Sequence, residues 1–344
     1  MQNMFLSRSE LRILAVLHLN ATLPAREVAK QIGMREQTVR HRLRSLKERK
    51  LISFRPLIDV YRLGFVQWGV FFSLSGGSTK SQVAVQRFLC EQDNVSFVGE
   101  LGGEYHFEVT VCARGPSDVA GFLENLGAKF SAGTIHKSVA TRLSLYDFRI
   151  KHLLGSEGTP KMLAWGEEPA HFVVDSTDHE ILRSLALGDF ESKLALSRTI
   201  GISHTAVDKR LLRLERNRIV VGYRYLVDMA ALGFHSHLIL LYARGMSVEF
   251  RNRLLRFCRD HPQVRFLVRN FGGWEYECGI EVRDPHDVSL FTRELSQEFS
   301  EELGTFRVLP IFGYPKVVNY PFVAAPLPES RGTNPEAKGI RPVR

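Results

Sequence analysis

The chain has 344 residues, of which 44% are hydrophobic and 24% charged, and a net charge of +9. This length favours two or more domains, and the composition is that of an ordinary globular protein. No run approaches the ~18 apolar residues of a membrane helix, and the first residues lack the basic and apolar segments of a signal peptide. The four cysteines form no C-x-x-C pair, which argues against zinc or a disulfide framework. We expect a cytoplasmic protein without metal, cofactor or membrane.

The sequence repeats itself at an offset of 168 positions. Ten residues of the first part return in the second at this spacing, and they form the pairs Ile13/Ile181, Leu14/Leu182, Leu17/Leu185, Val28/Leu196, Ile32/Ile200, Gly33/Gly201, Val39/Val207, Arg42/Arg210, Leu43/Leu211 and Leu46/Leu214. With small slips the register extends to the steps 63–65 and 232–234 and to the glycine pairs 102–103 and 272–273. A constant offset of this kind indicates a tandem duplication.

The first 50 residues predict three helices. Ser7 and Glu10 have the spacing of a capping box, and Pro24 suits the first turn of a second helix. A small residue at 29, Gly33 four positions later and Val39 six beyond it match the spacing of a helix-turn-helix. The second copy reads alike, with Thr177 and Glu180 at its first helix and Ser197, Gly201 and Val207 at the turn.

Positive charge is concentrated on the third helix of each copy. Residues 35–50 hold seven Arg or Lys against two Glu, a net charge of +5, and residues 203–218 hold five against two acids, a net charge of +3. A single basic run can be a solvated helix face. Two matched basic helices favour a polyanionic partner.

After each third helix a stretch typical of a strand follows, at 51–58 and 219–227, and we expect both to form β-wings. Residues 66–75, 80–92, 95–101, 105–112, 116–130 and 134–148 then predict the order βαββαβ, which is the ferredoxin-like arrangement. Phe107, Val109 and Val111 alternate with His106, Glu108 and Thr110, as in a sheet with one solvated face. The second copy repeats the order near 235–244, 247–260, 263–271, 275–283, 285–301 and 305–318.

These patterns predict an α+β chain of two tandem copies, each a winged helix-turn-helix followed by a ferredoxin-like domain. We expect helix-turn-helix domains at 1–60 and 173–228, and ferredoxin-like domains at 61–150 and 229–322. A Gly- and Pro-containing linker spans 151–172, with residues 163–165 docked on a neighbour. A disordered tail covers 323–344. One sheet face per ferredoxin-like domain needs a partner, either the other copy or another chain.

The chain resembles the leucine-responsive and asparagine regulator (Lrp/AsnC) family of transcription factors, over residues 5–148 and again from 173 to about 320. The resemblance rests on the segments 27–33 and 38–43, the Leu-Gly-Phe step at 63–65 and the Gly-Gly-Glu-Tyr segment at 102–105. It implies binding of double-stranded DNA, pairing between ferredoxin-like sheets and sensing of an amino-acid-like effector. Because family members usually have one repeat and dimerise, this chain resembles a fused dimer.

Two departures from the family pattern stand out. The family often has Gly where the third helix meets the wing, and this chain has Lys50 and Arg218. Their charge could offset backbone strain at a helix end, or the cap could differ. In the family's effector loop the second acidic position is lost in both copies. The candidate effector residues are Gly103, Glu104, Tyr105, His106, Gly273, Trp274, Glu275 and Tyr276.

A recognition helix places its first two turns in the major groove. In the first copy this predicts contacts to DNA by Arg35, Gln37, Thr38, Arg40, His41, Arg42, Arg44, Lys47 and the wing residue Arg55. In the second copy it predicts contacts by Ser203, His204, Thr205, Lys209, Arg210, Arg213 and Arg216, with Asp208 able to accept from cytosine. Gln and Arg suit adenine and guanine edges, and the other arginines and lysines suit phosphates. Arg42 and Arg210 fit a phosphate contact and a structural salt bridge equally well.

Two alternatives compete with a DNA-binding regulator. Sirohaem decarboxylases resemble the same family, and such an enzyme would use histidines between the paired domains, for which His106, His136, His235 and His237 are available. The second alternative is a ligand-sensing or oligomerisation module whose helices form only protein surfaces. The charge on the two third helices argues against the module.

Overall fold

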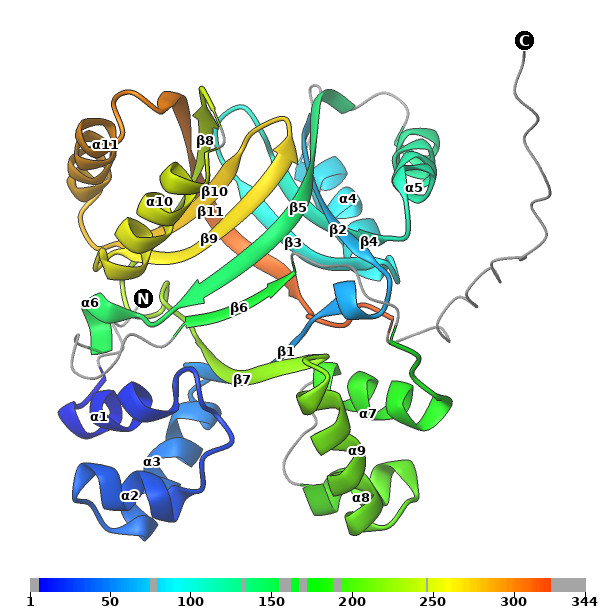
Figure 1. The fold of residues 1–344 in the computed structure, drawn as a ribbon, viewed down its shortest axis with the longest axis vertical. Coiled ribbons are helices and arrows are strands. Elements are labelled where there is room, and N and C mark those ends of the chain that lie inside the picture. The colour runs from blue at the N-terminus through cyan, green and yellow to red at the C-terminus, as the bar shows by residue number, and fades with distance from the viewer. Residues whose placement is uncertain are drawn as a thin grey trace.

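The computed structural model describes residues 6–74, 79–130, 134–154, 162–166, 172–187, 193–245 and 247–322. It confirms the α+β class and the tandem order of elements. Two groups of three helices lie on one side of a β-barrel, and a two-stranded ribbon runs between them and the barrel (Figure 1). The predicted tail, 323–344, lies outside the described residues.

The first copy begins with the helices α1 (Arg8–Leu17), α2 (Ala25–Ile32) and α3 (Glu36–Glu48). The strand β1 (Ile52–Ile58) and the short 3-10 helix η1 (Val60–Arg62) follow. The βαββαβ unit then consists of β2 (Val66–Leu74), α4 (Thr79–Glu91), β3 (Val95–Leu101), β4 (Phe107–Ala113), α5 (Pro116–Lys129) and β5 (Thr134–Phe148).

The segment between the copies contains α6 (Lys151–Leu154) and β6 (Met162–Gly166), and β6 pairs antiparallel with β5, as expected for the docked residues. The second copy has the helices α7 (Ser176–Leu187), α8 (Lys193–Ile200) and α9 (His204–Arg216). Its strands and remaining helices are β7 (Val220–Val227), β8 (His235–Ala243), α10 (Val248–Asp260), β9 (Val264–Gly272), β10 (Tyr276–Val282), α11 (His286–Glu298) and β11 (Leu303–Val317).

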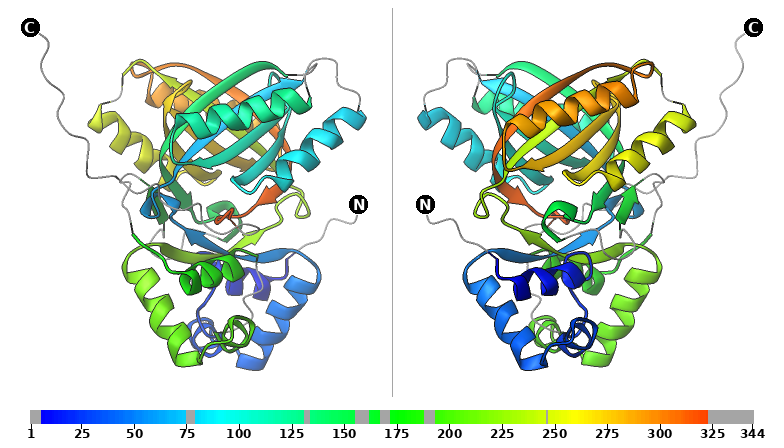
Figure 2. Two further views of the ribbon diagram at one scale, coloured as in Figure 1. Left: turned by 90° about the vertical axis from the view of Figure 1, so that its right-hand side faces the viewer. Right: turned by 90° about the vertical axis from the view of Figure 1, so that its left-hand side faces the viewer.

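The two ferredoxin-like sheets join edge to edge inside one chain. The first sheet has the order β5-β2-β4-β3 and the second the order β11-β8-β10-β9. Antiparallel pairing of β3 with β11 and of β5 with β9 closes the eight strands into a barrel, and β6 extends the edge of β5 beyond β2. Helices α4 and α5 cover the outside of one sheet, and α10 and α11 cover the other (Figure 2). The partner surface left open by the sequence is therefore supplied within the chain.

The inner face of the barrel is buried, so the solvated face expected for β4 is wrong. Phe107, Val109 and Val111 pack under the helices of the first copy, as predicted. Glu108 and Thr110 point to the opposite side and are only 5% and 2% exposed. The sheet of the second copy closes over this side, which the alternation within one strand cannot reveal.

The two predicted wings pair with each other. β1 and β7 form an antiparallel ribbon in which Phe54 faces Tyr225 and Arg55 faces Arg224. Next to this ribbon, the core of each group of three helices includes residues of the other copy. The core of α1–α3 contains residues 225–234 of the second copy, and the core of α7–α9 contains residues 58–65 of the first. Each helix group is thus held in place by the other half of the chain.

Candidate nucleic-acid interface

Both helix-turn-helix units have the predicted geometry. Gly33 and Gly201 adopt positive φ values of 62° and 77°, the left-handed conformation that a turn after a helix favours. Val39 and Val207 are fully buried between the helices. Exposed side chains of α3 and α9 therefore lie on a face fixed by well-packed turns.

The two positions at the ends of the third helices that depart from the family pattern have an unusual backbone conformation. Lys50 and Arg218 have φ values of 57° and 55°, and they are the two non-glycine residues with positive φ in the described part of the chain. The cap therefore keeps the geometry that favours Gly, and each side chain carries the strain of about 1–2 kcal/mol that a Cβ brings there.

The helix starts agree with the sequence in one copy and differ in the other. Ser7 and Glu10 form the predicted capping box of α1. The expected box of Thr177 and Glu180 is displaced, because Asp175 and Asp178 accept each other's backbone N–H groups at 2.8 and 3.3 Å. An Asp is an equally good cap, and its position two residues earlier starts α7 at Ser176.

The first copy presents an exposed cationic face on α3. Arg40 is 66% exposed in its side chain, although its guanidinium also pairs with Glu36 one turn earlier at 2.6 Å. Thr38 and Arg42 are half-buried beside this face. The other exposed members of the predicted set are Arg35, Gln37, His41, Arg44 and Lys47.

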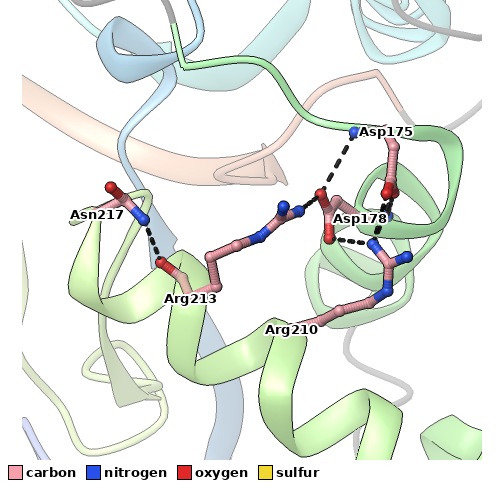
Figure 3. Close-up of polar contacts among 5 residues, drawn as sticks. All are labelled: Asp175, Asp178, Arg210, Arg213 and Asn217. Carbon is pink, nitrogen blue, oxygen red and sulfur yellow. Dashed lines mark hydrogen bonds and ion pairs between the residues drawn. The ribbon is translucent and has the colours of Figure 1, made fainter.

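In the second copy two of the predicted phosphate contacts are structural ion pairs. Arg210 contacts Asp175 at 2.7 Å and Asp178 at 2.8 Å, and Arg213 also contacts Asp178 (Figure 3). The Asp178 side chain is fully buried, so these arginines neutralise a charge that burial would otherwise make costly. Of the two roles that the sequence left open for Arg210, the structure shows the salt bridge, and the predicted phosphate contact of Arg213 competes with its ion pair to Asp178.

Glu10 has the corresponding place in the first copy, 168 positions earlier. It pairs with Arg49 at 2.8 Å. Burial raises the pKa of Glu10, but the hydrogen bonds with Ser7 and the charges of Arg49 and Arg42 outweigh burial and bring its pKa below the ordinary value. The sequence analysis assigned Glu10 to a capping box but missed its ion pair with Arg49, although the constant offset between Glu10 and Asp178 was a signal for it.

The remaining predicted residues of the second copy are exposed. Ser203 caps α9 by accepting from the Ala206 N–H at 3.2 Å. Asp208 is engaged by Lys193 at 2.6 Å and His204 at 3.3 Å, so it is not free to accept from a base as expected. The exposed polar face of α9 consists of Ser203, His204, Thr205, Lys209 and Arg216.

Arg55 does not belong to this face. It lies half-buried in the ribbon, and its guanidinium donates to the Phe54 carbonyl at 2.9 Å. Burial and then the charge of Arg224 lower the pKa of Arg55. Because the two wings pair with each other between the helices and the barrel, the predicted phosphate contact of Arg55 is wrong.

The candidate effector residues mostly have structural partners. Trp274 packs on Phe71 at 4.6 Å between ring centres and donates to Glu277 at 3.1 Å. Tyr105 is 3% exposed, and its hydroxyl lies 2.8 Å from the Ser138 hydroxyl. Three other candidates have polar partners: Glu104 pairs with Arg307, His106 accepts from the Leu74 N–H, and Glu275 accepts from the Ala243 N–H. Tyr276 is in the core of the second copy. The two glycines, Gly103 and Gly273, are exposed. The two loops are thus packed turns of the barrel, and an effector site at them stays a prediction.

The histidines considered for an enzyme lie on different parts of the barrel. His106 lies beside the end of β3, whereas His235 and His237 lie on β8, and β11 separates the two strands. The side chain of His136 lies outside the described residues. Among the described residues, no group of three His, Cys, Asp or Glu could hold a metal ion. No described helix is long and apolar enough to cross a membrane.

Two winged helix-turn-helix units on one barrel define the class of this chain, and comparisons agree with it. Residues 6–53 match the family model "Winged helix-turn-helix DNA-binding". An uncharacterised helix-turn-helix transcriptional regulator of Pyrococcus furiosus is 21% identical over 132 residues, which cover 38% of this chain and 85% of the relative. The proline dehydrogenase transcriptional activator of Rhodobacter capsulatus is 26% identical, over 37% of this chain and 82% of the relative.

The DNA-binding transcriptional activator DecR of Escherichia coli is also 26% identical, over 36% of this chain and 82% of the relative. These relatives are transcriptional regulators, and the chain is similar to each of them over a little more than a third of its length. The chain is similar in fold to the siroheme decarboxylase NirDL, with a TM-score of 0.59, 12% identity and coverage of 91% of this chain and 96% of that one. Together, the matched domain and the regulator relatives support a DNA-binding regulator.

Proposed function

We propose that this protein is a transcriptional regulator that binds double-stranded DNA, and that one chain presents two unlike recognition helices to two half-sites. The observation that carries the proposal is the exposed cationic face of α3, repeated in weaker form on α9, on two units with helix-turn-helix geometry. Phosphate contacts with such side chains supply affinity, and contacts to base edges supply sequence preference.

The two helices have different tasks in this proposal. On α3, Gln37, Arg40 and His41 read base edges in the major groove, and Arg35 and Lys47 contact phosphates. On α9, His204, Thr205 and Lys209 read base edges, and Arg216 contacts a phosphate. Since Arg210 and Arg213 are held by Asp175 and Asp178, α9 has fewer free cations and binds its half-site less tightly.

Fluorescence anisotropy with genomic DNA fragments tests the proposal. We expect saturable binding whose logarithm falls steeply with the logarithm of salt concentration, because each neutralised phosphate releases counterions. Arg35→Ala and Lys47→Ala should weaken binding to all fragments, because both remove a phosphate contact. Arg293→Ala, an exposed arginine on α11 far along the chain from both units, is the matched control and should bind as the wild type does. Absence of saturable binding, or equal binding by all variants, would contradict the proposal.

The same preparation separates the regulator from the two alternatives. An enzyme acting on sirohaem would bind an added iron-porphyrin-type molecule, and the Soret band of that molecule would shift. The regulator would bind DNA in the absence of such a molecule. A module without DNA binding would give the same anisotropy with every fragment. We also propose that a small molecule modulates DNA binding, and the barrel loops at Gly103 and Gly273 are not the place we assign to it.

A further inference from the structure

A cavity of about 280 Å³ lies where the two halves of the chain meet, below the barrel and beside the end of α9. This volume is near the lower end of the range for small-molecule sites, about 300–1,000 Å³. The linker strand β6 forms one wall, between β5 and the β1–β7 ribbon (Figure 1). The lining residues are Asp59, Arg62, Ser144, Tyr146, Ala164, Trp165, Gly166 and Arg218.

Two residues that line the cavity have buried polar atoms that lack a partner. Ser144 is 1% exposed, and its hydroxyl has no hydrogen-bond partner among the described residues. The buried Nε of Arg62 is also without an acceptor there. An unpaired buried polar group costs about 1–3 kcal/mol, so a site that keeps two of them at one cavity wall is suited to a ligand that satisfies them.

The charges at the cavity favour an anion. Asp59 is already satisfied, because it accepts from the N–H groups of Tyr61 at 3.0 Å and Gly166 at 3.3 Å. Arg218 uses one hydrogen bond, to the Ala164 carbonyl at 3.2 Å. With Arg62 and Arg218 positive and Asp59 negative, the lining has a formal charge of +1, which a singly charged anion neutralises.

The walls define the rest of the ligand. Trp165 and Tyr146 contribute aromatic side chains, against which the apolar part of a ligand can pack out of contact with water. Guanidinium groups match the planar fork of a carboxylate, and the Ser144 hydroxyl can donate to it. A small organic carboxylate with an aromatic or apolar body satisfies all these groups.

The second half of the chain does not repeat the polar residues of this cavity. The positions that correspond to Arg62, Ser144 and Arg218 in the other half are occupied by Ala231, Gly313 and Lys50. The second half therefore lacks both guanidinium groups and the hydroxyl. Duplication followed by divergence has left one asymmetric site, which predicts one ligand per chain.

We propose that this cavity binds a small organic monocarboxylate and that the bound ligand changes the hold of α9 on DNA. The link to α9 is Arg218, which comes two residues after the last residue of that helix, has a strained left-handed conformation and lines the cavity. A carboxylate bound to its guanidinium competes with the Ala164 carbonyl and shifts the end of α9. The effect on DNA binding rests on the proposed function, whereas the binding of the carboxylate does not.

Isothermal titration calorimetry without DNA tests the site itself. The probes are acetate, benzoate and phenylacetate, with benzamide as the uncharged match of benzoate and inorganic phosphate as a bare anion. We expect benzoate or phenylacetate to bind at one molecule per chain with a Kd below about 1 mM. We expect benzamide to bind at least about tenfold more weakly, because it lacks the charge that the arginines pair with.

Variants then assign the binding to this cavity. Arg62→Gln should weaken binding about tenfold, and Ser144→Ala about threefold, while Arg293→Gln on α11 should leave it unchanged. Far-UV circular dichroism and thermal unfolding check that each variant is folded. Failure of every carboxylate to saturate, tighter binding of phosphate than of benzoate, or equal affinity in Arg62→Gln and wild type would overturn the site.

DNA anisotropy with and without the tightest carboxylate tests the link to α9. We expect the DNA affinity to change at least about threefold in the wild type and not in Arg62→Gln. Calorimetric binding with unchanged DNA affinity would overturn the link while leaving the site in place. If the protein binds no DNA at all, the proposed function fails, and the calorimetry still decides the site.

Discussion

The guanidinium of Arg142, from the first copy, lies 2.7 Å from a carboxylate oxygen of Glu277, from the second. The same guanidinium contacts Glu108 and Thr110, and the indole of Trp274 donates to the other oxygen of Glu277 at 3.1 Å. All the charged groups of this network are nearly fully buried inside the barrel. One cation thus serves two acids from two copies and ties the sheets together.

Removing this cation should destabilise the fold strongly. In Arg142→Ala two buried carboxylates lose their partner, so we expect the free energy of unfolding to fall by about 3–5 kcal/mol. Urea denaturation followed by tryptophan fluorescence measures the loss. Arg293→Ala, an exposed arginine of α11, is the control and should change stability by less than about 0.5 kcal/mol. A loss below about 1 kcal/mol in Arg142→Ala would show that the network is not needed to hold the barrel.

The network also predicts a pH dependence of stability. Burial raises the pKa of Glu108 to about 7, and Glu277 adds to the shift while Arg142 opposes it. Between about 4.5 and 7 the folded protein therefore holds a proton that the unfolded chain has released. Stability from this group is present below about pH 4.5 and is lost as pH rises towards 7.

Buried histidines act in the opposite direction, so the test needs a difference between two proteins. Burial lowers the pKa of His152 to about 4, and stability from this group rises with pH over the same range. Subtracting the unfolding free energy of Glu108→Gln from that of the wild type at each pH cancels the histidines. We expect the difference to decrease from pH 4.5 to pH 7. If the difference in unfolding free energy does not change with pH, a group other than Glu108 binds the proton.

The strained caps predict a stabilising substitution. Lys50→Gly removes the Cβ that is unfavourable at a φ of 57°, and we expect a gain of about 0.5–1 kcal/mol after the entropy cost of Gly. Lys47→Gly, inside α3, is the matched control and should lose about 1 kcal/mol. Urea midpoints of the two variants should therefore move in opposite directions. A loss in Lys50→Gly would mean that the lysine side chain contributes more than the strain costs.

The sequence predicted the elements and the two turns because they depend on local patterns. Helical spacing of apolar residues, Gly33 and Gly201 at the turns and the repeat offset all act within one copy. The pairing of β1 with β7 and the burial of Glu108 could not be predicted in this way, because both result from how one copy closes on the other.

The site was predictable in part for the same reason. The exposure of Arg40 and Lys209 follows from their position on an amphipathic helix, opposite its buried face. The loss of Arg210 and Arg213 to ion pairs depends on Asp178, a single acid on a neighbouring helix that periodicity treats as any polar residue. The cavity at Ser144 combines residues from both halves and the linker, which no local motif records.

Two arginines, one on the third helix of each copy, should separate stability from DNA binding. Arg210→Ala removes a partner of the fully buried Asp178, so we expect a loss of stability of about 1–3 kcal/mol. Arg40→Ala removes a base contact from an exposed side chain, so we expect unchanged stability within about 0.5 kcal/mol and relaxed sequence preference at one base pair, at about 1–3 kcal/mol. Urea unfolding and anisotropy with single-base variants of one site measure both. Equal stability of Arg210→Ala and wild type would mean that the ion pair with Asp178 does not stabilise the fold and that Arg210 is available to contact DNA.

The two half-sites of the operator should differ in sequence. The helix α3 offers Gln37, Arg40 and His41 to the groove, whereas α9 offers His204, Thr205 and Lys209. At an offset of 168, Thr205 and Lys209 take the places of Gln37 and His41, so the same base pairs do not satisfy both helices. Selection of binding sites from a random DNA library should yield two unlike half-sites at a fixed spacing. Arg40→Ala should relax one half of the selected motif and Lys209→Ala the other. A perfect palindrome, or relaxation of both halves by either variant, would mean that both helices read the same sequence.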